Sequence, residues 1–171
     1  MAKVLIVIAQ EGFRDEELLV PKEIIGKEGH MVKVASLNRA KATGSMGAVV
    51  LPDMAVYEAN PEYFDAILIA GGPGSPVLSR TKEVVDLVEA SFKKGKIVGA
   101  ICLGPMTLAA AGVLSGKTAT VYPSPEGIEA LKNGGANYKP EPVIVDGKIV
   151  TADSPQSAGK FGTAVVELLK E

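Results

Sequence analysis

The chain has 171 residues, 47% of them hydrophobic, which suits one compact domain spanning residues 1–171. Its 18 Lys and Arg residues are scattered and face 20 Asp and Glu residues, so the formal charge of -2 excludes a basic footprint for nucleic acid. No apolar stretch approaches the roughly 20 residues that span a bilayer, and a lone cysteine cannot make an internal disulfide, which favours a reducing cytoplasm.

The first third of the chain alternates strand and helix patterns. Residues 4–9 form an apolar run that predicts a first core strand, and residues 14–29 carry helical spacing. Pro21 lies inside that helix, so we expect a kink or a restart there. Residues 31–37 alternate as a second strand. The only histidine, His30, falls in the turn before it, and we expect a solvated residue far from the carboxyl ends of the strands.

Three consecutive acidic residues open the first predicted helix. Asp15, Glu16 and Glu17 lie in its first turn, where negative charge suits the helix dipole, and this alone accounts for them. Glu16 and Glu17 are also the carboxylates nearest the end of the first strand, at the edge where open α/β sheets bind their ligands. Spacing does not distinguish between these two glutamates.

A glycine-rich loop follows the next buried strand. Residues 43–47 read as a turn and residues 48–51 as a short strand, before the apolar strand at residues 65–70. The loop at residues 71–76, Gly-Gly-Pro-Gly-Ser-Pro, lacks both the Lys-Ser/Thr of a P-loop and Gly-x-Gly-x-x-Gly spacing. Because glycine has no side chain, the glycines of this loop instead allow backbone N–H groups to come close to a reacting atom, as in an oxyanion hole.

The single cysteine lies between a predicted strand and a predicted helix. Residues 81–94 form an amphipathic helix, and a short apolar strand then leads to Cys102. Pro105 suits a first helical position, and the helix should weaken at Gly112 and end by Gly116. A helix N-terminus lowers a thiol pKa, so Cys102 is a candidate nucleophile. The alternative is a small buried core residue.

The remainder of the chain continues the alternation. We predict a strand at residues 118–121, a helix at residues 124–134, a hairpin at residues 143–152 and a closing helix at residues 155–170. Strands that alternate with helices indicate an α/β fold with a mostly parallel sheet covered on both faces. No Cys/His cluster has metal-ligand spacing, so we expect no zinc site.

Five motifs together resemble the ThiJ/PfpI superfamily, which includes the PfpI-type intracellular proteases and the parkinsonism-associated deglycase-like proteins. The resemblance covers essentially the whole chain and implies a flavodoxin-like three-layer sandwich related to class I glutamine amidotransferases. It also implies a homodimer or a higher homo-oligomer. The motifs are Glu17 four residues before Pro21, Ala-Gly-Gly at residues 70–72, Ala-Ile-Cys-Leu-Gly-Pro at residues 100–105, Val-Tyr-Pro at residues 121–123 and Val-Asp-Gly-Lys-Ile-Val-Thr at residues 145–151.

The resemblance implies roles for individual residues. Cys102 would lie at a strained nucleophile elbow, with a protonated Glu17 hydrogen-bonded to its thiolate. The backbone N–H groups of Gly72 and Leu103 would face the developing oxyanion. Leu103 departs from the protease-like members, which carry histidine directly after the nucleophile. Because His30 is predicted to be remote, no Cys–His pair is available within one chain for thiol proteolysis.

Three further positions differ from the deglycase-like animal members. Met46 and Asp153 stand where that branch has arginines around an anion, which weakens any transfer of its substrate preference. Tyr122 replaces a pocket histidine of that branch. Its hydroxyl is expected either to donate a hydrogen bond to a bound oxygen or to belong to a half-buried structural tyrosine.

These observations leave three functions open. The first is cofactor-free glyoxalase- or deglycase-like chemistry, as a hydro-lyase or hydrolase, on a small reactive carbonyl, with Cys102 as nucleophile and Glu17 moving the proton. The second is a redox-responsive or chaperone-like stress protein whose Cys102 is oxidised to a sulfinate. The third, an intracellular cysteine peptidase, is disfavoured by Leu103. None of the three requires a metal, nucleic acid or a membrane.

Overall fold

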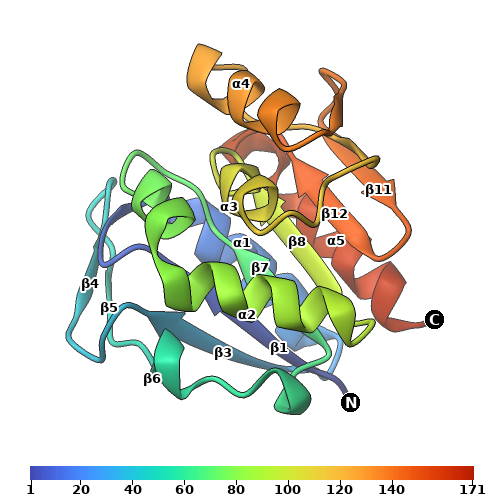
Figure 1. Ribbon diagram of the computed structural model, residues 1–171. Helices are drawn as coiled ribbons and strands as arrows, with labels where there is room; N and C mark the ends of the chain where they lie inside the picture. The colour runs from blue at the N-terminus through green and yellow to red at the C-terminus, as the bar shows by residue number, and fades with distance from the viewer.

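A seven-stranded sheet runs through the middle of the protein in the computed structural model, which describes residues 1–171 (Figure 1). The strand order is β11-β12-β8-β7-β1-β3-β6, and every neighbouring pair is parallel except the β11–β12 hairpin. The strands are β1 Lys3–Val7, β3 Met31–Ser36, β6 Met54–Ala55, β7 Ala66–Ile69, β8 Ile97–Ile101, β11 Val143–Asp146 and β12 Ile149–Ala152. The predicted mostly parallel sheet is confirmed.

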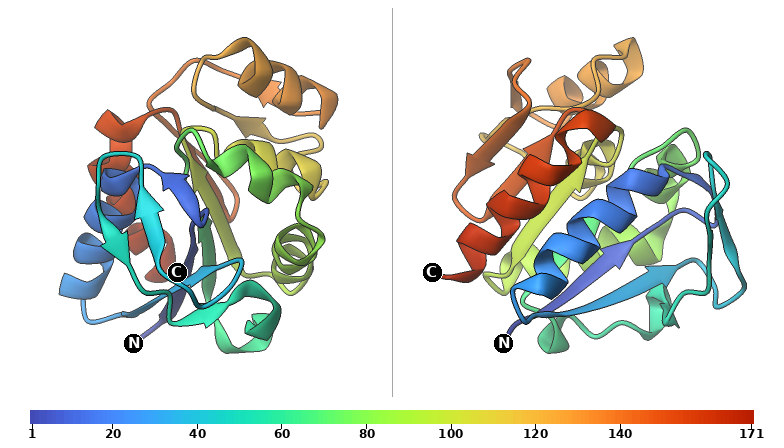
Figure 2. Two further views of the ribbon diagram at one scale, coloured as in Figure 1. Left: turned by 90° about the vertical axis from the view of Figure 1, so that its left-hand side faces the viewer. Right: turned by 180° about the vertical axis from the view of Figure 1, so that it is seen from behind.

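Helices cover both faces of this sheet. The paired helices α1 (Asp15–Lys27) and α5 (Ala158–Leu169) lie on one face, and α2 (Lys82–Lys93) and α3 (Pro105–Ala110) lie on the other (Figure 2). α4 (Pro125–Asn133) packs against α3. This arrangement confirms the predicted flavodoxin-like three-layer sandwich. No helix combines the length and the apolar character needed to cross a membrane.

Alternate residues along each strand contribute to the two halves of the core, one on each face of the sheet. Leu5 and Val7 of β1 belong to the cluster that includes side chains of α2 and α3. Val4 and Ile6 belong to the cluster that includes side chains of α1 and α5. Because each side chain is at most 1% exposed, each contributes about 1.5–3 kcal/mol of burial free energy. The apolar strands of the sequence are therefore explained by two covered faces.

Pro21 does not divide the first helix. α1 runs without interruption from Asp15 to Lys27, so the predicted restart is wrong. Proline removes the N–H that would bond the carbonyl of Glu17 and costs about 3 kcal/mol in a helix interior. Pro21 is buried, and a Cβ on Gly162 of α5 would lie 3.1 Å from its Cα. Close packing of α1 on α5 offsets the loss.

Most of the short elements were not predicted from the sequence, although β5 (Val49–Val50) lies within the short strand expected at residues 48–51. The strands β2 (Glu11–Phe13), β4 (Ala42–Gly44) and β5 (Val49–Val50) form a separate small sheet. The strand expected at residues 118–121 is only β9 (Thr118–Ala119), which pairs with β10 (Asn137–Tyr138) outside the central sheet. Elements of two or three residues carry no detectable periodicity, which is why the sequence does not reveal them.

The helix after Cys102 is shorter than expected. α3 ends at Ala110, although the apolar spacing continues to Leu114. Gly112 has φ 78°, a left-handed conformation that ends helices, and the segment beyond it continues as turns. Val113 and Leu114 remain buried in the core, so burial of the apolar residues did not require helix.

Candidate active site

Cys102 lies directly after β8, at the edge of the sheet where the parallel strands end. Its N–H donates to the carbonyl of Ala152 at 2.9 Å, and its own carbonyl accepts from the N–H of Tyr122 at 2.8 Å. Cys102 has φ 63° and is the only non-glycine residue with positive φ. Such a conformation costs of order 1–3 kcal/mol and persists only where the surroundings impose it. The expected strained elbow is present.

Two glycines at the end of β7 make room for this elbow. A Cβ on Gly71 would lie 2.7 Å from the Cβ of Cys102 and 2.7 Å from Oε1 of Glu17. Gly72 has φ 110°, and a Cβ there would overlap the backbone nitrogen of Arg14. The glycine loop therefore serves close approach of three chain segments rather than phosphate binding.

Glu17 lies beneath the cysteine, with 1% of its surface exposed. Neither carboxyl oxygen has a hydrogen-bond partner of ordinary geometry, although the Cys102 thiol and the Gly71 N–H lie close enough to lower its pKa. Burial outweighs both effects and raises the pKa of Glu17 to about 8. A pKa of about 8 makes the neutral form of this carboxyl the main one at neutral pH.

Burial also acts on the cysteine itself. It raises the pKa of the Cys102 thiol to about 12, with further contributions from the charge and the hydrogen bond of Glu17, while the N–H groups of Gly72 and Leu103 lower it. The lowered thiol pKa expected from the helix N-terminus is thus not found, because desolvation of the sulfur outweighs the effect of the nearby N–H groups. Since Glu17 is neutral below about pH 8, its charge opposes the thiolate only above that pH.

A cavity of about 330 Å³ opens onto Cys102. Every predicted site residue lines this cavity except Glu17, which is buried beneath Cys102. Tyr122 is 44% exposed, and its hydroxyl has no hydrogen-bond partner, so it is free to face a ligand. No group of three or more His, Cys, Asp or Glu side chains is arranged to hold a metal ion. The lining residues are Arg14, Gly72, Pro73, Cys102, Leu103, Tyr122, Pro155 and Gln156.

Arg14 and Gln156 line the cavity although the sequence gave no reason to select them. Arg14 stands between β2 and α1, and its guanidinium binds the carboxylate of Glu16. Gln156 follows β12 in a short turn. An arginine immediately before the Asp-Glu-Glu run is a detectable signal, because it is a cation at the ligand-binding edge of the sheet. Nothing in the sequence around Gln156 distinguishes it.

The three acidic residues of α1 have separate roles. Asp15 is buried, and its carboxylate accepts from the N–H groups of Met46 and Ala48 at 3.0 and 2.8 Å, which fixes the turn between β4 and β5. Glu16 pairs with Arg14 at the surface. Only Glu17 points towards Cys102. The structure therefore distinguishes two glutamates that spacing left equivalent.

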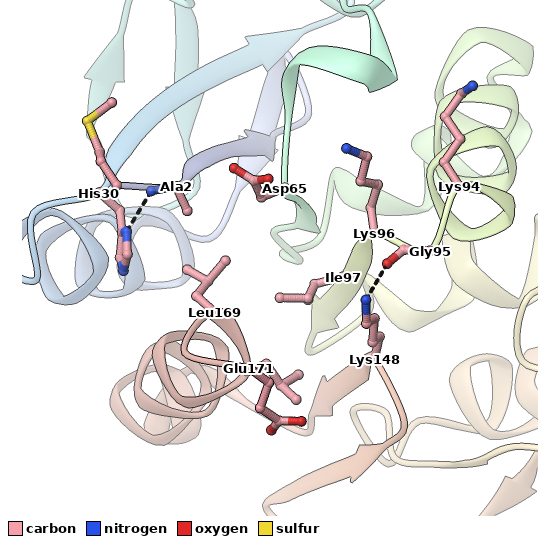
Figure 3. A pocket seen from close by; sticks show the side chains of 12 residues that line it. Ala2, His30, Asp65, Lys94, Gly95, Lys96, Ile97, Lys148, Leu169 and Glu171 are labelled. Atoms are coloured by element: carbon pink, nitrogen blue, oxygen red, sulfur yellow. Dashed lines mark hydrogen bonds between the residues drawn. The ribbon is translucent and has the colours of Figure 1, made fainter.

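His30 lies at the opposite edge of the sheet, as predicted. Its Nδ1 accepts from the N–H of Ala2 at 3.0 Å, and it lines a second cavity of about 470 Å³ with Asp65, Lys96 and Lys148 (Figure 3). This larger cavity lies at the amino ends of the strands and contains neither Cys102 nor Glu17. It is therefore not the site of cysteine chemistry.

The two positions where the animal members have arginines, Met46 and Asp153, lie outside the Cys102 cavity. Met46 is 65% exposed on the β4–β5 turn. Asp153 accepts hydrogen bonds from the hydroxyls of Ser154 and Ser157 at 2.9 and 2.8 Å. Neither side chain lines the cavity, so within one chain the cation of the site is supplied by Arg14 alone.

Comparisons with known proteins agree with this geometry. The sequence profile of the DJ-1/PfpI family matches residues 2–168. The deglycase TK1284 of Thermococcus kodakarensis is 38% identical over 166 residues, which cover 97% of this chain and 99% of that protein. The glutathione-independent glyoxalase DJR-1.2 of Caenorhabditis elegans is 28% identical, over 97% of this chain and 88% of that protein. The crystal structure of a ThiJ/PfpI domain protein from Brachyspira murdochii superposes with a TM-score of 0.94 at 31% identity, over 98% of this chain and 96% of that one.

Proposed function

The chain belongs to the DJ-1/PfpI family, and from this we propose that it is an enzyme acting on small reactive carbonyl compounds, of the glyoxalase or deglycase kind. The observation that carries the proposal is the pairing of a strained Cys102 with a buried Glu17 whose pKa is about 8. The backbone N–H groups of Gly72 and Leu103 lie close enough to the same thiol to lower its pKa. The chemistry below uses only these groups.

The first step is addition of the thiol to an aldehyde. A bond forms between Sγ of Cys102 and the carbonyl carbon, and the π electrons of the carbonyl become an oxyanion that the N–H groups of Gly72 and Leu103 stabilise. The thiol proton passes to this oxygen, with Glu17 as the relay, and the product is a hemithioacetal. Because the thiol proton never enters bulk water, the raised pKa of Cys102 does not prevent addition.

The second step moves a proton between adjacent carbons of an α-oxoaldehyde. Ionised Glu17 removes the proton from the carbon bonded to sulfur, and protonated Glu17 returns it to the neighbouring carbon, which gives a thioester. Water then hydrolyses the thioester and restores the thiol, so methylglyoxal and water become lactate. A pKa of about 8 keeps both forms of Glu17 accessible near neutral pH, as general acid–base catalysis requires.

Formation of lactate from methylglyoxal tests the proposal. Lactate is the correct readout because loss of methylglyoxal also reports adducts with surface lysines. We expect Cys102→Ala to abolish lactate formation and Glu17→Gln to lower kcat by about a hundredfold or more. Glu23→Gln, an exposed glutamate on the same helix, should retain activity. A wild-type rate no higher than that of Cys102→Ala would refute the proposal.

Oxidation of Cys102 is a second candidate because a neutral Glu17 can donate a hydrogen bond to an oxidised sulfur. Two equivalents of peroxide would convert the thiol first to a sulfenic acid and then to a sulfinic acid, each releasing water. Intact mass after mild peroxide should show two added oxygens on Cys102. Absence of that species, or no change in the protein's behaviour when it forms, would count against a sensor role.

Peptidase activity is the least supported of the three. Thiol proteolysis needs a base beside the nucleophile. Leu103 occupies the adjacent position, and His30 lies at the other edge of the sheet. We expect no casein hydrolysis above that of Cys102→Ala. Hydrolysis that depends on Cys102 would contradict this expectation.

A further inference from the structure

Arg14 is the only charged side chain that lines the Cys102 cavity. We propose that Arg14 binds a carboxylate of the substrate, so that the preferred substrates are α-oxoaldehydes carrying a carboxylate a few bonds from the reacting carbonyl. This inference rests on the proposed function and narrows its substrate class. It concerns selection of the substrate rather than the bond-making steps, which belong to Cys102 and Glu17.

The backbone places Arg14 beside the reacting centre. Its N–H donates to the carbonyl of Gly71 at 2.9 Å, and its nitrogen packs against Cα of Gly72, where no side chain fits. The N–H of Gly72 is one of the two backbone donors that lie close enough to Cys102 to lower its pKa. Arg14 is therefore hydrogen-bonded to the loop that would supply the oxyanion donor, and it lines the same cavity. Its guanidinium also lies close enough to the reacting centre that the hydrogen bond to Glu16, followed by the charges of Glu17 and Cys102, raises its pKa.

One edge of the guanidinium is occupied and the other is free. Nε of Arg14 donates to Oε1 of Glu16 at 3.0 Å, and Nη2 donates to Oε2 at 2.9 Å. No hydrogen bond from Nη1 occurs. The Nη1 and Nη2 protons that remain form a second planar fork, which matches the two oxygens of a carboxylate. Glu16 holds the guanidinium and thereby presents this free edge, while 31% of the arginine side chain stays exposed.

The rest of the cavity favours a single negative charge. Leu103, Pro73 and Pro155 are apolar, and Tyr122 and Gln156 contribute a hydroxyl and an amide. One cation matches a monoanionic carboxylate better than a dianionic phosphate, for which the cavity offers no second cation. The cavity has a volume of about 330 Å³, which corresponds to roughly eleven waters at about 30 Å³ of liquid each. A molecule as small as methylglyoxal does not fill this volume.

The test compares one carbon skeleton with and without its charge. The substrates are γ,δ-dioxovalerate, which water converts to α-hydroxyglutarate by the proposed chemistry, and its methyl ester. We expect the wild type to favour the acid at least tenfold in kcat/KM. Arg14→Gln should reduce that ratio to about one, mainly through a higher KM for the acid. Arg14→Lys keeps the charge without the fork and should retain only part of the preference.

Arg39→Gln is the matched control. Arg39 binds Glu58 through Nε and Nη2, just as Arg14 binds Glu16, but it lies outside the cavity. This variant should keep the wild-type ratio of acid to ester. Thermal unfolding of Arg14→Gln and Arg14→Lys checks that each variant is folded. Added salt should reduce the preference of the wild type for the acid.

The outcomes separate this inference from the proposed function. Turnover of both substrates with the same ratio in the wild type and in Arg14→Gln would overturn the inference and leave the function intact. An equal fall for both substrates with a shifted pH profile would also overturn it, because Arg14 would then act on Glu17 and Cys102. If the wild type turns over neither substrate, calorimetry with α-hydroxyglutarate decides. Binding at least tenfold weaker in Arg14→Gln supports the anion site, and equal binding refutes it.

Discussion

Replacement of Glu17 by Gln should change how the stability of the protein depends on pH. Glu17 has a pKa near 4.5 when unfolded and about 8 when folded, because burial penalises its charge. Between these values the unfolded chain has released the proton and the folded protein has kept it. The free energy of unfolding therefore falls by about 1.4 kcal/mol per pH unit as the pH rises.

The size of this effect follows from the two pKa values. The penalty is absent below about pH 4, reaches about 3 kcal/mol at pH 7 and levels off near 5 kcal/mol above pH 8. Glu17→Gln removes this titration. The variant differs from the wild type by a constant offset, from the exchange of a hydroxyl for an amide, plus a gain that grows with pH.

Urea unfolding at about pH 5, 6, 7 and 8 measures the difference between the wild type and Glu17→Gln at each pH. We expect the variant to gain about 4 kcal/mol relative to the wild type across this range. Glu23→Gln, whose exposed carboxylate has a lowered pKa, should show no such gain. A flat difference for Glu17→Gln would mean that Glu17 is ionised at neutral pH, and the raised pKa on which its proposed acid–base role rests would be wrong.

Three other predictions concern the loops and the pH optimum. Gly72→Ala should lower the free energy of unfolding by about 3 kcal/mol or more, because the new Cβ would overlap the backbone of Arg14. Gly29 has φ 88° and open space around it, so Gly29→Ala should cost only about 1 kcal/mol. Equal losses in urea unfolding would contradict the close approach at Gly72. Asp15→Ala removes the acceptor of two backbone N–H groups, so it should lower the free energy of unfolding by about 3 kcal/mol and speed proteolysis of the β4–β5 turn. Asp86→Ala breaks only an exposed ion pair and should lower the free energy of unfolding by less than about 1 kcal/mol. The rate of lactate formation should rise as the pH approaches about 8, because the ionised form of Glu17 that removes the carbon-bound proton becomes more abundant. A rate unchanged from about pH 6 to about pH 8 would contradict that role.

The long elements of the fold could be read from the sequence because their signals are local. Continuous apolar runs indicate strands that are buried on both faces, as at residues 4–9, 65–70 and 97–101. The amphipathic pattern of α2 indicates a helix that is buried on one face. The restart expected at Pro21 does not occur because the energy that keeps α1 continuous comes from α5, far away in sequence. Local propensity gives way wherever tertiary packing contributes more.

The site was predicted to different extents. Cys102 and its turn were recognisable from a strand, a cysteine and a Gly-Pro start of a helix. Glu17 was separated from Glu16 only by the family resemblance, since both follow the same strand at helical positions. Arg14 was missed because its importance depends on which way its side chain points.

The sequence by itself determined the class of fold, the place of the candidate nucleophile Cys102 and the absence of a histidine beside it. Hydrophobic periodicity, the positions of glycines and residue identity are all local properties of the chain. Only the tertiary structure decided the protonation of Glu17, the raised pKa of Cys102 and the entry of Arg14 into the cavity. Each of these depends on desolvation and on distances between segments that are brought together when β1, β7 and β8 end at one edge of the sheet.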